Sequence, residues 1–135
     1  MPTIHKTTFI NVPPEQAWDA IRDVGAFHLR LVPGLTADTR LDGNERTLIL
    51  GDGSTVKEAI VSIDEEERRL VFAVKEGRMP LSHHNASFQI IPDPQGGSQF
   101  IWITDFLPAE LTEAIQVQAD RVSTVIKQTI EAASK

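Results

Sequence analysis

The sequence predicts a single α+β domain, residues 1–135, in which a curved seven-stranded antiparallel sheet wraps around one long C-terminal helix. Apolar and polar residues alternate through most of the chain before Pro108, as they do in strands that bury one face. After Pro108 the apolar spacing changes to about 3.6 residues, which is typical of an amphipathic helix. The length of 135 residues is that of one domain with a substantial core.

The first expected elements are a strand and two short helices. The strand covers residues 4–12 and ends at Pro13-Pro14, because proline cannot donate to a strand ladder. The same prolines suit the first turn of a helix, and Gly25 stands where a cap would end that helix. A second short helix or turn is expected over residues 26–31.

Six further strands are expected in the middle of the chain, separated by turns rich in Gly, Asp and Asn. They cover residues 36–41, 46–50, 55–63, 69–75, 83–91 and 99–106. Asp52-Gly53 is a strong hairpin signal, and a two-residue turn there places Glu58 opposite Thr47. A shift of one residue would instead turn Arg46 towards the interior, and the sequence leaves both registers open.

The last expected element is a helix of about 26 residues that begins at Pro108 and is roughly 40 Å long. Its apolar stripe must be covered, and only the sheet is large enough to cover it. Because a curved sheet cannot close completely on a straight helix, we expect a cavity lined by side chains between them. The stripe consists of Leu111, Ile115, Ala119, Val122, Ile126, Ile130 and Ala133.

Composition excludes several classes of function. The absence of cysteine excludes disulfides, thiolate catalysis and metal sites built on sulfur. Thirteen basic and nineteen acidic residues give a net charge of −6, which disfavours nucleic acid and anionic membrane surfaces as partners. No apolar run approaches the ~20 residues of a membrane span, and the first residues do not form a signal peptide, so we expect a cytoplasmic protein. No cofactor or metal motif is present, and we expect neither group.

Strand parity selects Glu58 and His84 as candidate acid–base residues of the cavity. His84 shares an apolar strand face with Phe88, whereas the adjacent His83 points to the opposite face and cannot share a metal ion with it. A buried carboxylate needs a partner or takes up a proton. If both candidates face the cavity, the glutamate should favour imidazolium at His84. The alternatives are a structural histidine, and a glutamate paired to Arg46 or to water.

Bulky side chains are expected both to pack the interior and to line the cavity, because the two roles overlap in this arrangement. The expected ligand contacts among them are Trp18, Phe72, Phe88, Trp102 and Phe106.

Several short sequences, taken in order, resemble the START-like or SRPBCC helix-grip superfamily over essentially the whole chain. This superfamily includes birch-pollen-type allergens, lipid-transfer domains, the polyketide cyclase/dehydrase family and abscisic-acid receptors. The resemblance is carried by Val12–Trp18, Ile21–Gly25, Val56–Ile60 with Asp64, Arg69–Phe72, Met79–Leu81 and Trp102–Phe106.

The resemblance implies a helix-grip fold with a pocket for a hydrophobic molecule. It matches Glu58 to a family glutamate and places His28 where a basic residue of the hormone receptors meets the ligand's carboxylate. It also places residues 51–54 and 77–80 where two receptor loops close over the ligand, which makes Met79 a candidate contact. The receptor loop carries a Leu-Pro pair that Asp52-Gly53 lacks, and this difference argues against a hormone receptor.

Three functions therefore remain open. The first is binding of a lipid-like, aromatic or polyketide-like small molecule in the cavity, with that molecule as the main partner. The second is a cyclase/dehydratase-type enzyme that uses Glu58 and His84 as acid and base. The third is an interaction module like the chaperone-ATPase activators of this fold, which a fully packed interior would favour. The sequence leaves the oligomeric state open, including a homodimer.

Overall fold

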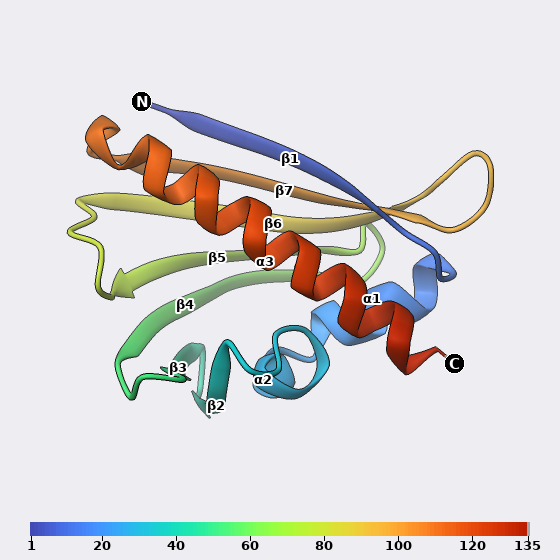
Figure 1. The fold of residues 1–135 in the computed structure, drawn as a ribbon, viewed down its shortest axis with the longest axis horizontal. Coiled ribbons are helices and arrows are strands. Elements are labelled where there is room, and N and C mark those ends of the chain that lie inside the picture. The colour runs from blue at the N-terminus through green and yellow to red at the C-terminus, as the bar shows by residue number, and fades with distance from the viewer. Residues whose placement is uncertain (135) are drawn as a thin grey trace.

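The computed structural model describes residues 1–134, and its elements follow the expected order (Figure 1). The strands are β1 (Thr3–Ile10), β2 (Thr36–Asp42), β3 (Glu45–Leu50), β4 (Thr55–Asp64), β5 (Arg69–Glu76), β6 (His83–Pro92) and β7 (Ser98–Leu107). The helices are α1 (Pro14–Arg22), α2 (Phe27–Arg30) and α3 (Thr112–Ala133), with 3₁₀ turns at Val24–Ala26 and Ala109–Leu111.

The seven strands form one antiparallel sheet in the order β1-β7-β6-β5-β4-β3-β2. Figure 1 shows α3 running across one face of this sheet, with α1 and α2 beside its C-terminal half. The expected fold class, a helix-grip α+β domain, is confirmed. Within the described residues no helix is both long and apolar enough to cross a membrane.

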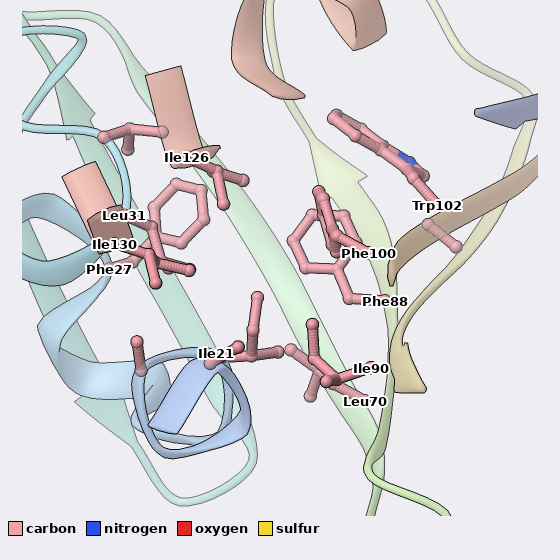
Figure 2. Close-up of a cluster of buried hydrophobic side chains, with 14 of the residues drawn as sticks. Ile21, Phe27, Leu31, Leu70, Phe88, Ile90, Phe100, Trp102, Ile126 and Ile130 are labelled. Carbon is pink, nitrogen blue, oxygen red and sulfur yellow. The ribbon is translucent and has the colours of Figure 1, made fainter. Parts of the chain in front are cut away.

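The hydrophobic core joins α3 to the two short helices and to the sheet. Figure 2 shows Ile126 and Ile130 of α3 on the same side of the cluster as Leu31, with Ile21 of α1 below them. On the sheet side, the ring of Phe88 makes edge-on contacts with three other aromatic rings at centroid distances of 4.9–5.0 Å. These partners are Phe72, Phe100 and Trp102.

The cap of the first helix lies two residues earlier than the sequence predicts. Its C-cap is Asp23, and Gly25 lies in the following 3₁₀ turn without the positive φ of a helix-capping glycine. A Cβ atom at Gly25 would lie 2.9 Å from Cδ1 of Leu41 on β2. A larger residue at this position would have to displace the exposed side chain of Leu41, so Gly25 makes room for β2 and does not cap the helix.

The long helix also begins later than expected, at Thr112, because Pro108 is extended (φ −79°, ψ 161°) and a 3₁₀ turn follows it. Most of the predicted stripe faces inward, although Val122 and Leu111 are only partly buried and Ala133 is exposed. The buried stripe residues are Ile115, Ala119, Ile126 and Ile130.

The β3–β4 hairpin has the alternative register. The amide of Leu50 donates to the carbonyl of Ser54, and Gly53 at φ 87° closes a three-residue loop. The pairing of Glu58 with Thr47 that a two-residue turn predicts is therefore wrong by one residue, and Glu58 lies opposite Arg46. Both side chains consequently lie on the same, inner face of the sheet.

Candidate functional site

An internal cavity of about 530 Å³ lies between the sheet, the N-terminal half of α3 and the segment around α2. This volume is within the range of small-molecule sites. Much of its wall is apolar, with side chains that include Phe27, Leu35, Leu48, Phe88, Trp102 and Ile115. Its polar lining consists mainly of Glu58, His84 and Thr104 in the wall and of Asp52, Arg78 and Arg121 among the more exposed residues.

The cavity exists because the two halves of α3 are covered differently. Ile126 and Ile130 of the C-terminal half are buried in the core beside α1 and α2. The N-terminal half, from Ala114 to Val122, borders the cavity instead. The expected cavity beside the C-terminal helix is therefore present.

Six of the nine side chains predicted for the site line this one cavity. They come from strands β4 to β7 and from the loop between β5 and β6, so residues far apart in the sequence converge. They are Glu58, Phe72, Met79, His84, Phe88 and Trp102.

The other three, Trp18, His28 and Phe106, do not line the cavity. The indole Nε1 of Trp18 donates to Oε1 of Glu65 at 2.7 Å, which directs the side chain towards the β4–β5 turn. Nδ1 of His28 lies 2.9 Å from the hydroxyl of Thr39 on β2. Phe106 is fully buried in the core. Strand parity and the family resemblance predict that these residues lie in or near the interior, but they do not predict which of them contact the cavity.

Arg46 and Glu58 form a buried ion pair at the cavity wall, with 1% and 5% of their surfaces exposed. Nε of Arg46 donates to Oε1 of Glu58 at 2.9 Å, and Nη2 donates to the same oxygen. The guanidinium also donates to the carbonyl of Val24 and lies against the rings of Phe27 and Phe72, 4.7 and 5.5 Å from their centroids. The second carboxylate oxygen, Oε2, accepts no hydrogen bond from the described residues and remains available to a ligand.

His84 is held as a neutral hydrogen-bond donor. The amide of Val74 donates to its Nδ1 at 2.9 Å, so the ring proton belongs on Nε2, which lies 3.4 Å from Oγ1 of Thr104. The pKa of His84 is lowered to about 4, mainly by burial and to a smaller extent by the charge of the neighbouring His83. The expected imidazolium is therefore wrong, because burial dominates and the charge of Glu58 is directed at Arg46.

Two loops meet at the mouth of the cavity through an ion pair. Nη1 of Arg78, in the β5–β6 loop, donates to Oδ2 of Asp52, in the β3–β4 loop, at 2.7 Å. Hydrogen bonds from Ser54 lower the pKa of Asp52, and Arg78 lowers it further. Both loops were identified from the sequence, but this pair was not.

The polar residues that α3 contributes to the site were not predicted from the sequence either. Gln118 and Arg121 line the cavity beside Val117 and Val122. Their spacing of three and four residues places them on one face of the helix, next to the apolar stripe. This spacing could have indicated that both residues border the cavity. Polar residues beside an apolar stripe are, however, usually exposed to solvent alone.

A curved antiparallel sheet, a long C-terminal helix and a cavity between them define a helix-grip domain with an internal cavity. The chain belongs to the polyketide cyclase/dehydrase and lipid transport family, whose sequence profile matches residues 1–133. This confirms the resemblance drawn from the sequence. A search of curated proteins finds no match.

Solved structures share the fold at low sequence identity. XoxI from Bacillus cereus is 21% identical, with a TM-score of 0.84 over 98% of this chain and 95% of its own. Norcoclaurine synthase from Thalictrum flavum, solved with a transition-state analogue, is 15% identical, with a TM-score of 0.74 over 99% and 96%. Ara h 8.0201 is 18% identical, with a TM-score of 0.76 over 97% and 98%. At these identities the likeness shows the fold alone.

The buried ion pair predicts strong coupling between its two residues. Arg46→Met and Glu58→Leu should each lower the free energy of unfolding by about 3–5 kcal/mol, because each leaves the other charge buried without a partner. The double variant should lose much less than the sum. Urea unfolding of the four proteins measures this, and an additive double variant would contradict it. The exposed pair Lys75–Glu45 is the control, and its coupling should be much weaker than that of the buried pair.

The lowered pKa of His84 predicts a dependence of stability on pH. Between pH 6.5 and about 4 the unfolded chain binds a proton at this residue that the folded chain does not, so the free energy of unfolding falls as the pH falls. In His84→Asn, whose amide oxygen can still accept from Val74, this part of the decline should disappear. His83→Asn should retain most of it. Equal slopes for the parent and His84→Asn in chemical unfolding would contradict the assignment.

Proposed function

We propose that the protein binds an apolar small molecule in this cavity and contacts an uncharged polar group of that molecule through Glu58 and His84. The observation that carries the proposal is a cavity of about 530 Å³ whose largely apolar wall includes the carboxylate of Glu58 and the neutral ring of His84. A lipid-like, aromatic or polyketide-like body fits this description. The family to which the chain belongs, described as polyketide cyclase/dehydrase and lipid transport, supports the same class of ligand.

The energetics favour an apolar body with few polar groups. Each methylene group moved from water into such a wall contributes roughly 0.8 kcal/mol, so a medium-sized ligand gains enough to be held. Oε2 of Glu58 accepts from a hydroxyl, and Nε2–H of His84 donates to a carbonyl or hydroxyl oxygen. Because the Arg46–Glu58 pair is neutral as a unit and His84 is uncharged, this wall suits an uncharged group better than an ion.

A cyclase/dehydratase-type enzyme is the second candidate, supported by the presence of Glu58 and His84 in one cavity. Cyclisation and dehydration need a base near an acidic carbon and a donor near a carbonyl oxygen. With Nδ1 bonded to Val74, His84 would be the donor and Glu58 the base. Oε1 of Glu58 already accepts two hydrogen bonds from Arg46, which leaves only Oε2 for a substrate, so binding is the better-supported function.

The interaction-module alternative receives less support. A fully packed interior would favour it, whereas this interior holds a cavity bordered by both α3 and the sheet. A cytoplasmic location stays a prediction from the sequence, and the oligomeric state, including a homodimer, stays open.

A cavity-filling substitution tests the binding function. Val56 on β4 lines the cavity, whereas Val61 on the same strand is 59% exposed and lies outside it. Val56→Trp should weaken binding of the neutral dye N-phenyl-1-naphthylamine by about tenfold or more, because the indole occupies the ligand's volume. Val61→Trp should leave the affinity unchanged. Fluorescence titration measures both, and equal affinities for the two variants would contradict the proposed site.

A further inference from the structure

The cavity lining contains four charged side chains, and three of them are compensated. Glu58 is paired with Arg46, and Asp52 is paired with Arg78. The fourth is Arg121 of α3, which makes no hydrogen bond or ion pair with any residue in the range 1–134. An unpaired cation at the cavity contrasts with the net charge of −6 of the whole chain.

The surroundings of Arg121 on α3 explain why it has no partner. Residues three and four positions away are the side-chain neighbours of a helical residue, and here they are all uncharged. The adjacent carboxylate, Asp120, lies 3.3 Å from Nζ of Lys6 on β1 and is therefore engaged elsewhere. The four uncharged neighbours are Val117, Gln118, Thr124 and Val125.

Arg121 and Arg78 both line the cavity. Gln118, one helical turn before Arg121, lines a smaller adjoining cavity of about 90 Å³ together with Arg78 and Met79. Arg121 is exposed and Arg78 is 65% exposed, so both guanidinium groups lie where the cavity meets solvent. Arg78 uses only Nη1 for Asp52, which leaves its other N–H groups free to donate.

The deeper wall cannot neutralise a charge on a ligand. Arg46 and Glu58 cancel each other, and His84 is neutral at physiological pH. An ion placed against them would be desolvated without compensation. A charged group of a ligand therefore belongs at the mouth, where an arginine without a partner is available.

We infer that the ligand is an amphipathic carboxylate, whose apolar body fills the cavity and whose carboxylate group binds Arg121 at the mouth. One unpaired guanidinium matches one negative charge, and its planar N–H groups fit the two oxygens of a carboxylate. This inference rests on the proposed binding function and adds the class of ligand to it.

Three ten-carbon probes with different head groups test the inference: decanoate, 1-decanol and decylamine, each displacing N-phenyl-1-naphthylamine at pH 8. Decanoate should bind more tightly than the other two. Arg121→Gln should weaken the binding of decanoate roughly three- to tenfold, because an exposed ion pair contributes modestly to affinity. The same variant should leave the affinity for decanol unchanged. Added salt should weaken decanoate binding to the parent and have little effect in the variant.

Arg69→Gln is the matched control, because Arg69 is exposed, forms no ion pair within residues 1–134 and lies outside the cavity lining. Arg69→Gln should change neither the affinity for decanoate nor the affinity for decanol. Equal effects of Arg121→Gln on decanoate and decanol, or tighter binding of decylamine than of decanoate, would overturn the inference while the cavity still binds decanol. Failure of the dye and of all three probes to bind would instead overturn the proposed function, and the inference with it.

Discussion

The fold depends on how one curved sheet covers one straight helix. An isolated α3 would expose its apolar stripe, so its stability comes from the elements that cover it. Beside its C-terminal half, Ile21 of α1 and Leu31 after α2 complete a solid core around Ile126 and Ile130. Beside its N-terminal half the sheet leaves a cavity. The packing solution at one end of α3 thus determines where a ligand can bind.

The same buried face of the sheet determines how the polar groups of the cavity wall are arranged. Each polar side chain on a buried face needs a hydrogen-bond or ion-pair partner. Arg46 and Glu58 compensate each other between two aromatic rings, and His84 is fixed by the amide of Val74. The outcome is a wall with no net charge that still presents an acceptor and a donor. Such a wall can orient an uncharged group without a large cost of desolvation.

Most of the fold was predictable from the sequence, because alternation, proline positions and the long helical stripe are local signals. Parity also brought Glu58 and His84 to the interior correctly. The register of the β3–β4 hairpin was not predictable, since it depends on whether Asp52-Gly53 forms a two-residue turn or part of a three-residue loop. Arg121 was missed because a charged residue beside a helical stripe resembles an ordinary solvated one until the tertiary structure places it at a cavity.

The central claim is that the cavity beside α3 holds an apolar ligand, and the two tryptophans of the chain test it directly. Trp102 lines the cavity and Trp18 does not. A decanol brominated at its far end quenches the fluorescence of an indole that it contacts. In Trp18→Phe, the fluorescence of the remaining Trp102 should be quenched. In Trp102→Phe, the fluorescence of the remaining Trp18 should not be quenched. Equal quenching in the two variants, or quenching of Trp18 alone, would contradict it.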